Sequence, residues 1–155
     1  MKKILIVEDD QNTQEMLSEA VKAMGFQPRT EENGKEGLQA FESDQFAMIL
    51  TDTKMPVMDG IEMIKKIREK NQNIPIIVIT AYPSVDSAVE SLVLGADFYL
   101  VKPVNLNDLE IKIGKCLEKI RLQKKYYAQK VLTLILSATI PLWLALGYFL
   151  GWLFR

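Results

Sequence analysis

The sequence predicts an α/β domain with a doubly wound, five-stranded parallel sheet, followed by one C-terminal transmembrane helix. Short apolar runs rich in β-branched residues alternate with amphipathic segments over the first 120 residues. Such alternation is typical of a parallel sheet with helices on both faces. The last 25 residues contain an uncharged stretch that is long enough to cross a bilayer. We therefore expect a globular domain at residues 1–120, a basic neck at 121–130 and a membrane helix at 131–154.

Four strand candidates are continuous apolar runs, as expected for strands that are buried on both faces of a sheet. They are residues 4–7, 47–51, 76–80 and 98–101. A weaker candidate at residues 27–30 contains Pro28. Proline cannot donate a hydrogen bond to a neighbouring strand, so this fifth strand is expected at an edge of the sheet.

Capping residues mark the ends of the predicted helices. Asn33, Ser84 and Asn105 are candidate first residues, and Gly25 and Gly95 follow two apolar periodic stretches as candidate C-terminal caps. The periodicity predicts the buried faces of the last two helices as well. In the fourth helix this face is Val85, Ala88, Val89 and Leu92, and in the fifth it is Leu106, Leu109, Ile113, Leu117 and Ile120.

Charge is distributed unevenly along the chain, although the net charge is only −1. Residues 1–104 carry 17 acidic and 11 basic side chains, whereas residues 105–130 carry 7 basic and 3 acidic ones. The single cysteine, Cys116, excludes an internal disulfide and is interpreted as a small core residue. Histidine is absent, which excludes histidine-based catalysis and histidine metal ligands.

Polar residues follow the strand candidates at the points where the strands end. They are Glu8, Asp9 and Asp10 after the first strand, Asp52 after the third, Thr80 at the end of the fourth and Lys102 after the fifth. The carboxyl ends of parallel strands share one edge, so these groups should meet there. Clustered carboxylates repel one another unless a cation intervenes, and Mg²⁺ suits an oxygen-rich site. With a lysine opposite, the set describes a carboxylate nucleophile for a phosphoryl group.

The motifs ILIVEDD, TDTKMPVMDG, ITAY and YLVKP occur in that order over roughly residues 2–120. In these motifs the chain resembles the response-regulator receiver family of two-component signalling. The resemblance implies a flavodoxin-like fold with strand order 2-1-3-4-5. It also implies phosphorylation in trans by a sensor histidine kinase or a phosphotransfer protein, because this chain has no histidine of its own.

The resemblance also implies a role for each matching residue. Asp52 would be the phospho-acceptor, Asp9 would bind Mg²⁺ directly, and Glu8 would assist through water. The backbone carbonyl of Lys54 would supply a further metal ligand. The turn after the acceptor would be shaped by Met55, Pro56, Asp59 and Gly60.

Three further residues would respond to the phosphoryl group. Lys102 would contact it, Thr80 would move toward it, and Tyr99 would rotate inward behind Thr80. Plainer interpretations stay open: Thr80 as a helix cap and Tyr99 as ordinary strand packing. For Asp10 we favour a helix-capping role over metal binding. Whether the bond between Lys102 and Pro103 is cis is left open by the sequence.

Residues 131–154 contain no charged side chain and would form a helix of about 36 Å. The basic residues that precede this segment favour a cytoplasmic receiver and a single pass through the inner membrane. Gly147 and Gly151 form a weak G-x-x-x-G pair that is compatible with a homodimer. The alternative is a buried hairpin or an oligomerisation helix.

Taken together, these features predict a membrane-anchored, single-domain response regulator with Mg²⁺ as its cofactor and an unknown downstream protein as its partner. Output would use protein–protein contacts and no nucleic acid. Slow self-dephosphorylation is expected, but no enzymatic activity on another substrate. A phosphate sink or phosphorelay intermediate is the main alternative. An aspartyl-phosphate phosphohydrolase is disfavoured, because Lys54 stands where such enzymes usually have a second acid.

Overall fold

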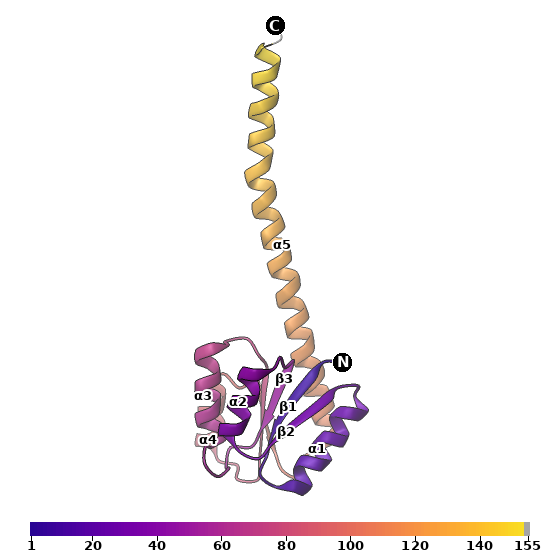
Figure 1. Ribbon diagram of the computed structural model, residues 1–155, viewed down its shortest axis with the longest axis vertical. Coiled ribbons are helices and arrows are strands. Elements are labelled where there is room, and N and C mark those ends of the chain that lie inside the picture. The colour runs from indigo at the N-terminus through magenta and orange to yellow at the C-terminus, as the bar shows by residue number, and fades with distance from the viewer. Residues whose placement is uncertain (154–155) are drawn as a thin grey trace. The chain divides into compact units, whose positions relative to one another are not determined.

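The computed structural model describes residues 1–153 and the side chains in that range except those of residues 142, 144–151 and 153. The chain divides into two compact units, Met1–Cys116 and Leu117–Arg155. The first unit contains a five-stranded parallel sheet with the order β2-β1-β3-β4-β5, shown in Figure 1. The predicted fold class and strand order are thus confirmed for this unit.

The five strands lie close to the predicted positions. Their bounds are β1 Lys3–Val7, β2 Gln27–Glu31, β3 Met48–Thr51, β4 Ile76–Thr80 and β5 Phe98–Val101. In the pairing of β1 with β3, Val7 is opposite Thr51, and in the pairing of β4 with β5, Thr80 is opposite Val101. The residues that follow these pairs therefore leave the sheet side by side. The strand with Pro28 lies at an edge, as predicted.

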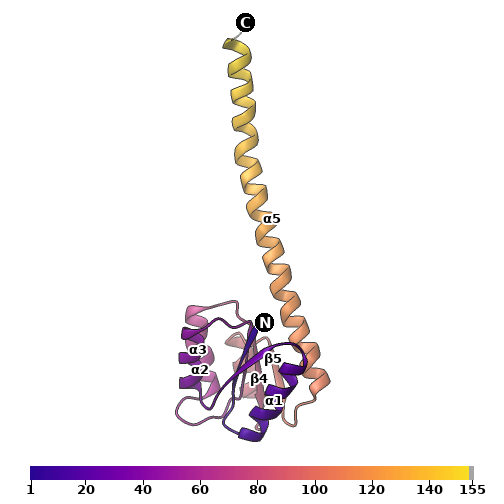
Figure 2. The ribbon, with the colours of Figure 1, turned by 45° about the vertical axis from the view of Figure 1, so that its right-hand side comes forward.

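Four helices connect the strands and a fifth follows the last strand. Their bounds are α1 Gln11–Ala23, α2 Gly34–Ser43, α3 Gly60–Lys70, α4 Val85–Val93 and α5 Leu106–Leu153. In both ribbon views, α1 and the first turns of α5 lie on one side of the sheet and α2 and α3 on the other (Figures 1 and 2). Gly25 and Gly95 have φ values of 83° and 99°, so each follows its helix in the left-handed conformation that glycine adopts readily.

The core lies on both faces of the three central strands. Every side chain from Ile4 to Val7 and from Met48 to Leu50 is fully buried. On one face, alternate strand residues pack with α2 and α3 in a cluster that includes Ala40, Met63 and Ile67. Complete burial on both faces explains why these strands are continuous apolar runs in the sequence.

The prediction for the buried face of α4 was wrong at three positions. Val85, Val89 and Leu92 are 79%, 54% and 49% exposed. Ser91 is fully buried instead, and Ala88 is half-buried. The hydroxyl of Ser91 donates to the Ser87 carbonyl at 2.6 Å, so its burial leaves no polar group without a partner. Small residues therefore face the domain, and the apolar stripe of α4 faces outward.

The first part of α5 packs on the domain through Leu109, Ile113 and Cys116, all buried as predicted. Leu106 was predicted to be buried but is 43% exposed. In the part of the chain that the structure describes, no helix combines the length and the apolar character needed to cross a membrane. The predicted membrane segment at residues 131–154 lies partly outside the described side chains, and residues 154–155 lie outside the description altogether.

Gly60, the first residue of α3, lies in close contact with the backbone of Asp52. A Cβ atom on Gly60 would lie 1.9 Å from the carbonyl oxygen of Asp52, whereas one on Gly114 would meet nothing within 4 Å. We expect Gly60→Ala to lower the free energy of unfolding by about 2–3 kcal/mol through overpacking. Gly114→Ala, the matched control in an exposed helix, should raise it by about 0.5–1 kcal/mol. Equilibrium urea denaturation measures the free energy of unfolding of both variants. Equal changes in the two variants would contradict the close backbone contact at Gly60.

Candidate functional site

Three carboxylates gather at the carboxyl edge of the sheet. Glu8 follows β1 and Asp52 follows β3, so the register of the two strands places them side by side. Asp9 is the third acid of this cluster. One carboxylate oxygen from each of the three residues lies within 4.8 Å of the other two. Glu8 and Asp52 are buried, whereas Asp9 is exposed. The site therefore has a closed inner part and an open outer part.

A single lysine bridges the two buried acids. Lys102 Nζ donates to Glu8 Oε1 at 2.7 Å and to Asp52 Oδ2 at 2.6 Å. Its backbone N–H donates to the Thr80 carbonyl at 2.8 Å, which anchors the end of β5 to β4. The peptide bond between Lys102 and Pro103 is cis, which answers the question that the sequence left open.

The pKa values of Glu8 and Lys102 are both raised, but for different reasons. Burial raises the pKa of Glu8 above its ordinary value, although the bond to Lys102 opposes this. Burial would also lower the pKa of Lys102, but the hydrogen bonds and charges of Asp52 and Glu8 outweigh it and raise that pKa. The lysine is thus held as a cation, whereas burial disfavours the ionised form of Glu8.

The loop after β3 fixes one oxygen of Asp52. The backbone N–H groups of Thr53 and Lys54 both donate to Oδ1, the latter at 3.2 Å. With Oδ2 bonded to Lys102, the two oxygens of this carboxylate have different partners. Farther along the loop, Asp59 caps α3 by accepting from the Glu62 N–H at 2.8 Å. The turn thereby holds Asp52 in a defined orientation.

The donor set fits Mg²⁺. Three carboxylates converge with only one ammonium among them, and hard oxygen donors are the ligands that this ion prefers. Asp9 is exposed, so waters could complete the coordination from the solvent side. The predicted contribution of the Lys54 carbonyl stays a prediction. Asp10 is outside the cluster and caps α1 by accepting from the Thr13 N–H at 2.8 Å, in agreement with its expected capping role.

Two threonine hydroxyl groups, those of Thr53 and Thr80, are connected to Asp52, and only Thr80 was predicted from the sequence. Thr80 is fully buried, and its Oγ1 lies 2.7 Å from Thr53 Oγ1. Thr53 Oγ1 lies in turn 3.3 Å from Asp52 Oδ1. The signal for Thr53 was its place directly after the acid at the end of a buried strand, where a second polar side chain should reach the same edge.

Tyr99 lies apart from the acids. Its ring packs against the core cluster, and its hydroxyl is 2.9 Å from Ser87 Oγ on α4. Ser87 also forms the capping box of α4 with Ser84. The structure thus brings Glu8, Asp9, Asp52 and Lys102 into one cluster, with Thr80 joined through Thr53, and connects Tyr99 to α4 instead.

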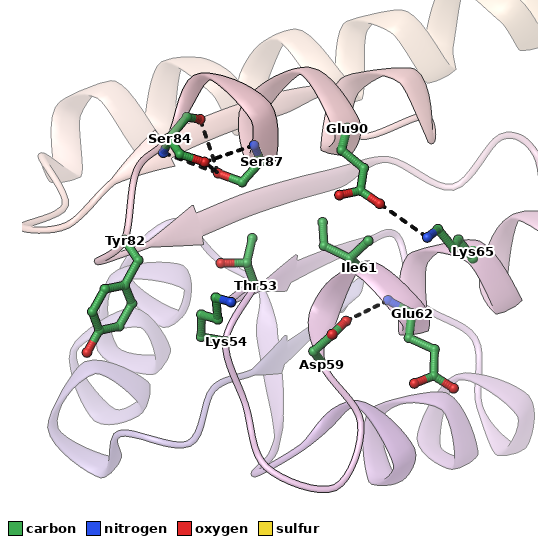
Figure 3. Close-up of a pocket in the computed structure, with 10 residues that line it drawn as sticks. All are labelled: Thr53, Lys54, Asp59, Ile61, Glu62, Lys65, Tyr82, Ser84, Ser87 and Glu90. Carbon is green, nitrogen blue, oxygen red and sulfur yellow. Dashed lines mark hydrogen bonds and ion pairs between the residues drawn. The ribbon is translucent and has the colours of Figure 1, made fainter.

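A cavity of about 330 Å³ opens beside the loop that follows Asp52. Figure 3 shows its lining side chains, which come from this loop, α3, the segment that leads into α4, and α4 itself. An ion pair of 3.2 Å between Lys65 and Glu90 connects α3 with α4 at one side. Thr53 and Lys54 belong to both the acid site and the cavity lining, so a molecule entering the cavity would be adjacent to Asp52.

Comparison with known proteins places residues 4–114 in a match to the family described as response regulator receiver domain. The regulatory protein AtoC of Escherichia coli K12 is 37% identical over 123 residues, which are 79% of this chain and 27% of that protein. The transcriptional regulatory protein PcoR of E. coli is 36% identical over 123 residues, which are 79% of this chain and 54% of that protein. The chain thus spans between about a quarter and a half of the length of these relatives.

Solved structures give the same picture. A CheY-like receiver domain from Methanospirillum hungatei JF-1 matches with a TM-score of 0.76 and 33% identity, covering 79% of this chain and 98% of that one. The response regulator TrrA from Thermotoga maritima, solved in complex with Mg²⁺-BeF, matches with a TM-score of 0.69 and 37% identity. That match covers 75% of this chain and 99% of TrrA.

The bridging position of Lys102 predicts a large effect of its removal on stability. Lys102→Met leaves two buried carboxylates without their cation, so we expect the free energy of unfolding in EDTA to fall by about 2–3 kcal/mol. Excess Mg²⁺ should restore part of this loss. The control Lys65→Met removes an exposed ion pair and should cost no more than about 1 kcal/mol. Equal losses in urea denaturation would contradict the bridging role.

The raised pKa of Glu8 predicts how this effect depends on pH. An acid whose folded-state pKa lies above its unfolded value of 4.5 destabilises the fold where it is ionised, and protonation removes that cost as pH falls through the folded pKa. Without Lys102 the cost is larger. The stability gap between wild type and Lys102→Met should therefore narrow as pH is lowered toward 4.5, as measured by urea denaturation at a series of pH values. A gap that is constant with pH would be inconsistent with this account.

Proposed function

The chain belongs to the response regulator receiver family, and on that premise we propose that it is a membrane-anchored receiver that accepts a phosphoryl group on Asp52. The donor would be a sensor histidine kinase or a phosphotransfer protein, as is general for receiver domains. It must act in trans, because this chain contains no histidine. The modified receiver would signal through protein–protein contacts.

The observation that carries this proposal is the environment of the Asp52 carboxylate. Its Oδ1 is fixed by loop N–H groups and its Oδ2 by the Lys102 ammonium, with two further acids in reach. An oxygen of Asp52 would form a bond to phosphorus while the P–N bond of the donor's phosphohistidine breaks. The leaving imidazole keeps the bonding electron pair and takes a proton from solvent. Little more than positioning and charge neutralisation is needed for such a transfer.

Glu8, Asp9 and Asp52 would hold the magnesium ion. When bound, Mg²⁺ would supply positive charge to the oxygens of the transferring group. Support for this choice comes from the oxygen donors of the cluster and from the relative TrrA, which is described in complex with Mg²⁺-BeF. Lys102 would move its ammonium from the resting carboxylates toward the incoming phosphoryl oxygens, and Thr80 would approach from the other side. Self-dephosphorylation would be slow.

Support for the membrane anchor comes from residues 131–154, which contain no charged residue. Three apolar side chains at the start of this stretch, Leu132, Leu134 and Ile135, are all more than half exposed. Their spacing places them on different sides of the helix. A helix that exposes apolar groups on every side needs an apolar surrounding. A bilayer provides one, and the length suffices for its hydrocarbon core of about 30 Å.

The hydroxyl groups in this helix are consistent with a lipid environment. Thr133 Oγ1 donates to the Gln129 carbonyl at 2.9 Å, and Ser137 Oγ donates to the Leu134 carbonyl at 2.9 Å. Each hydroxyl is thereby paired within its own helix, as the hydrocarbon core requires. Tyr126 and Tyr127 stand just before the segment, where aromatic residues collect at membrane interfaces.

The orientation follows from the basic residues of the neck. Five lysine and arginine residues between positions 119 and 130 precede the apolar segment. Positive flanking charge favours the cytoplasmic side, so the receiver would face the cytoplasm and the chain would cross the inner membrane once. The neck would also be attracted to anionic headgroups by about 1 kcal/mol per charge.

Phosphotransfer tests the acceptor directly. We expect Asp52→Asn to abolish labelling by a phosphorylated donor protein, and Asp9→Asn to lower the labelling rate at limiting Mg²⁺. The control Asp10→Asn keeps a side-chain cap for α1 and should label as wild type does. Labelling that survives in Asp52→Asn would disprove the assignment. Rapid loss of the label with no partner recovered by crosslinking would instead favour a phosphate sink or relay.

Carbonate extraction tests the anchor. We expect the full chain to stay in the membrane pellet at high pH, because a spanning helix resists extraction that releases peripheral proteins. A chain that ends at Lys130 should appear in the supernatant. Release of the full chain into the supernatant would exclude a spanning helix and would favour the oligomerisation alternative.

A further inference from the structure

Thr53 lies between two groups of the proposed mechanism but has no part in it so far. Its side chain is 4% exposed, and its Oγ1 contacts Thr80 Oγ1 at 2.7 Å and Asp52 Oδ1 at 3.3 Å. It is one of the residues that line the cavity in Figure 3. Within the described residues, every buried side-chain nitrogen and oxygen has a hydrogen-bond partner, so this pair of threonines is fully satisfied in the resting site.

The direction of these hydrogen bonds follows from counting donors and acceptors. A hydroxyl group has one proton to donate and can accept two bonds. An ionised carboxylate only accepts, so the proton of Thr53 points to Asp52 Oδ1. The bond between the two threonines must then be donated by Thr80. Thr80 Oγ1 also accepts from the Tyr82 N–H at 3.2 Å. The result is a directed chain from Tyr82 through Thr80 and Thr53 to Asp52.

We propose that Thr53 is a positioning residue that holds the hydroxyl of Thr80 in its resting place until Asp52 is phosphorylated. The proposal rests on the proposed function in one respect, namely that a phosphoryl group on Asp52 attracts Thr80. Phosphoryl oxygens are ionised and accept hydrogen bonds more strongly than a neutral hydroxyl does. Thr80 would therefore exchange its acceptor, from Thr53 to the phosphoryl group. The hydrogen bond to Thr53 must break in that exchange, so its strength determines the free-energy cost of moving Thr80.

Thr53→Val and Thr53→Ser separate the hydroxyl from the rest of the side chain. Valine keeps the branched shape but cannot accept the bond from Thr80, whereas serine can. A neutral hydrogen bond contributes a net stabilisation that corresponds to about a twofold to tenfold change in an equilibrium. This range is the expected size of each effect below.

The first experiment uses the unmodified full chain in detergent micelles, without a phosphoryl mimic. The amide hydrogen of Tyr82 reports the position of Thr80, because Thr80 Oγ1 is its acceptor. Thr53→Val should accelerate exchange of this hydrogen about twofold to tenfold, and Thr53→Ser should leave it near the wild-type rate. Amides of β1 serve as the internal control and should not change. Unchanged exchange at Tyr82 in Thr53→Val, or an equal acceleration throughout β1, would overturn the proposal.

The second experiment measures the affinity for beryllofluoride in the presence of Mg²⁺ by NMR titration. Thr53→Val should bind about twofold to tenfold more tightly than wild type, because the resting contact no longer competes. In a Thr80→Val background, the same substitution should have no effect, since the hydroxyl that it releases is absent. Weaker or unchanged binding in Thr53→Val would overturn the proposal, and so would equal tightening in the Thr80→Val background.

The two experiments separate this inference from the proposed function. If the wild-type chain and all variants fail to bind beryllofluoride, phosphoryl acceptance by Asp52 is disproved. The exchange rate of the Tyr82 amide then decides by itself whether Thr53 positions Thr80. A merely structural role for Thr53 would lower the stability of the fold in urea without changing the ratio of beryllofluoride affinities, and that result would count against the proposal.

Discussion

The ammonium group of Lys102 lies between two buried carboxylates, and the arrangement of the whole site depends on this contact. Glu8 and Asp52 directly follow neighbouring strands in the centre of the sheet, and both side chains are buried. Their carboxylate oxygens lie within 4.8 Å of each other, and two negative charges at this distance repel each other strongly in a buried environment. One lysine from the end of β5 compensates both at 2.6–2.7 Å, so that three strands are connected through charge at their carboxyl edge.

Lys102 does not neutralise all the negative charge of the cluster, and the remaining charge allows the site to bind a cation. Three acids meet one ammonium, which leaves the cluster with a negative excess that a divalent cation can neutralise. The burial that raises the pKa of Glu8 also strengthens every electrostatic interaction of a phosphoryl group placed there. The buried acids at the carboxyl edge of the sheet therefore favour the binding of a cation.

Around the charged groups, the hydroxyl groups of Thr53, Thr80 and Tyr99 form further hydrogen bonds. Thr80 is connected to Asp52 through Thr53, whereas Tyr99 is connected to the first turn of α4 through Ser87. The helix that Tyr99 touches presents its apolar stripe outward, with Val85 and Val89 exposed. The hydrogen bonds that begin at Asp52 thus reach Thr80, whereas a separate hydrogen bond joins Tyr99 to this surface helix.

The sequence by itself determined the fold class, the strand order expected from the family resemblance, the edge position of the strand with Pro28, and the set of acids with Lys102. These follow from local chemistry, because continuous apolar runs encode buried strands and the polar residues after them must emerge at one edge. Only the tertiary structure decided which face of α4 is buried, because helical periodicity gives an apolar stripe but not the neighbour that it meets. The hydrogen-bond partners of Thr53 and Ser87 also became visible only in the tertiary structure. A hydroxyl acquires its partner from across the sheet, at distances that no spacing along the chain records.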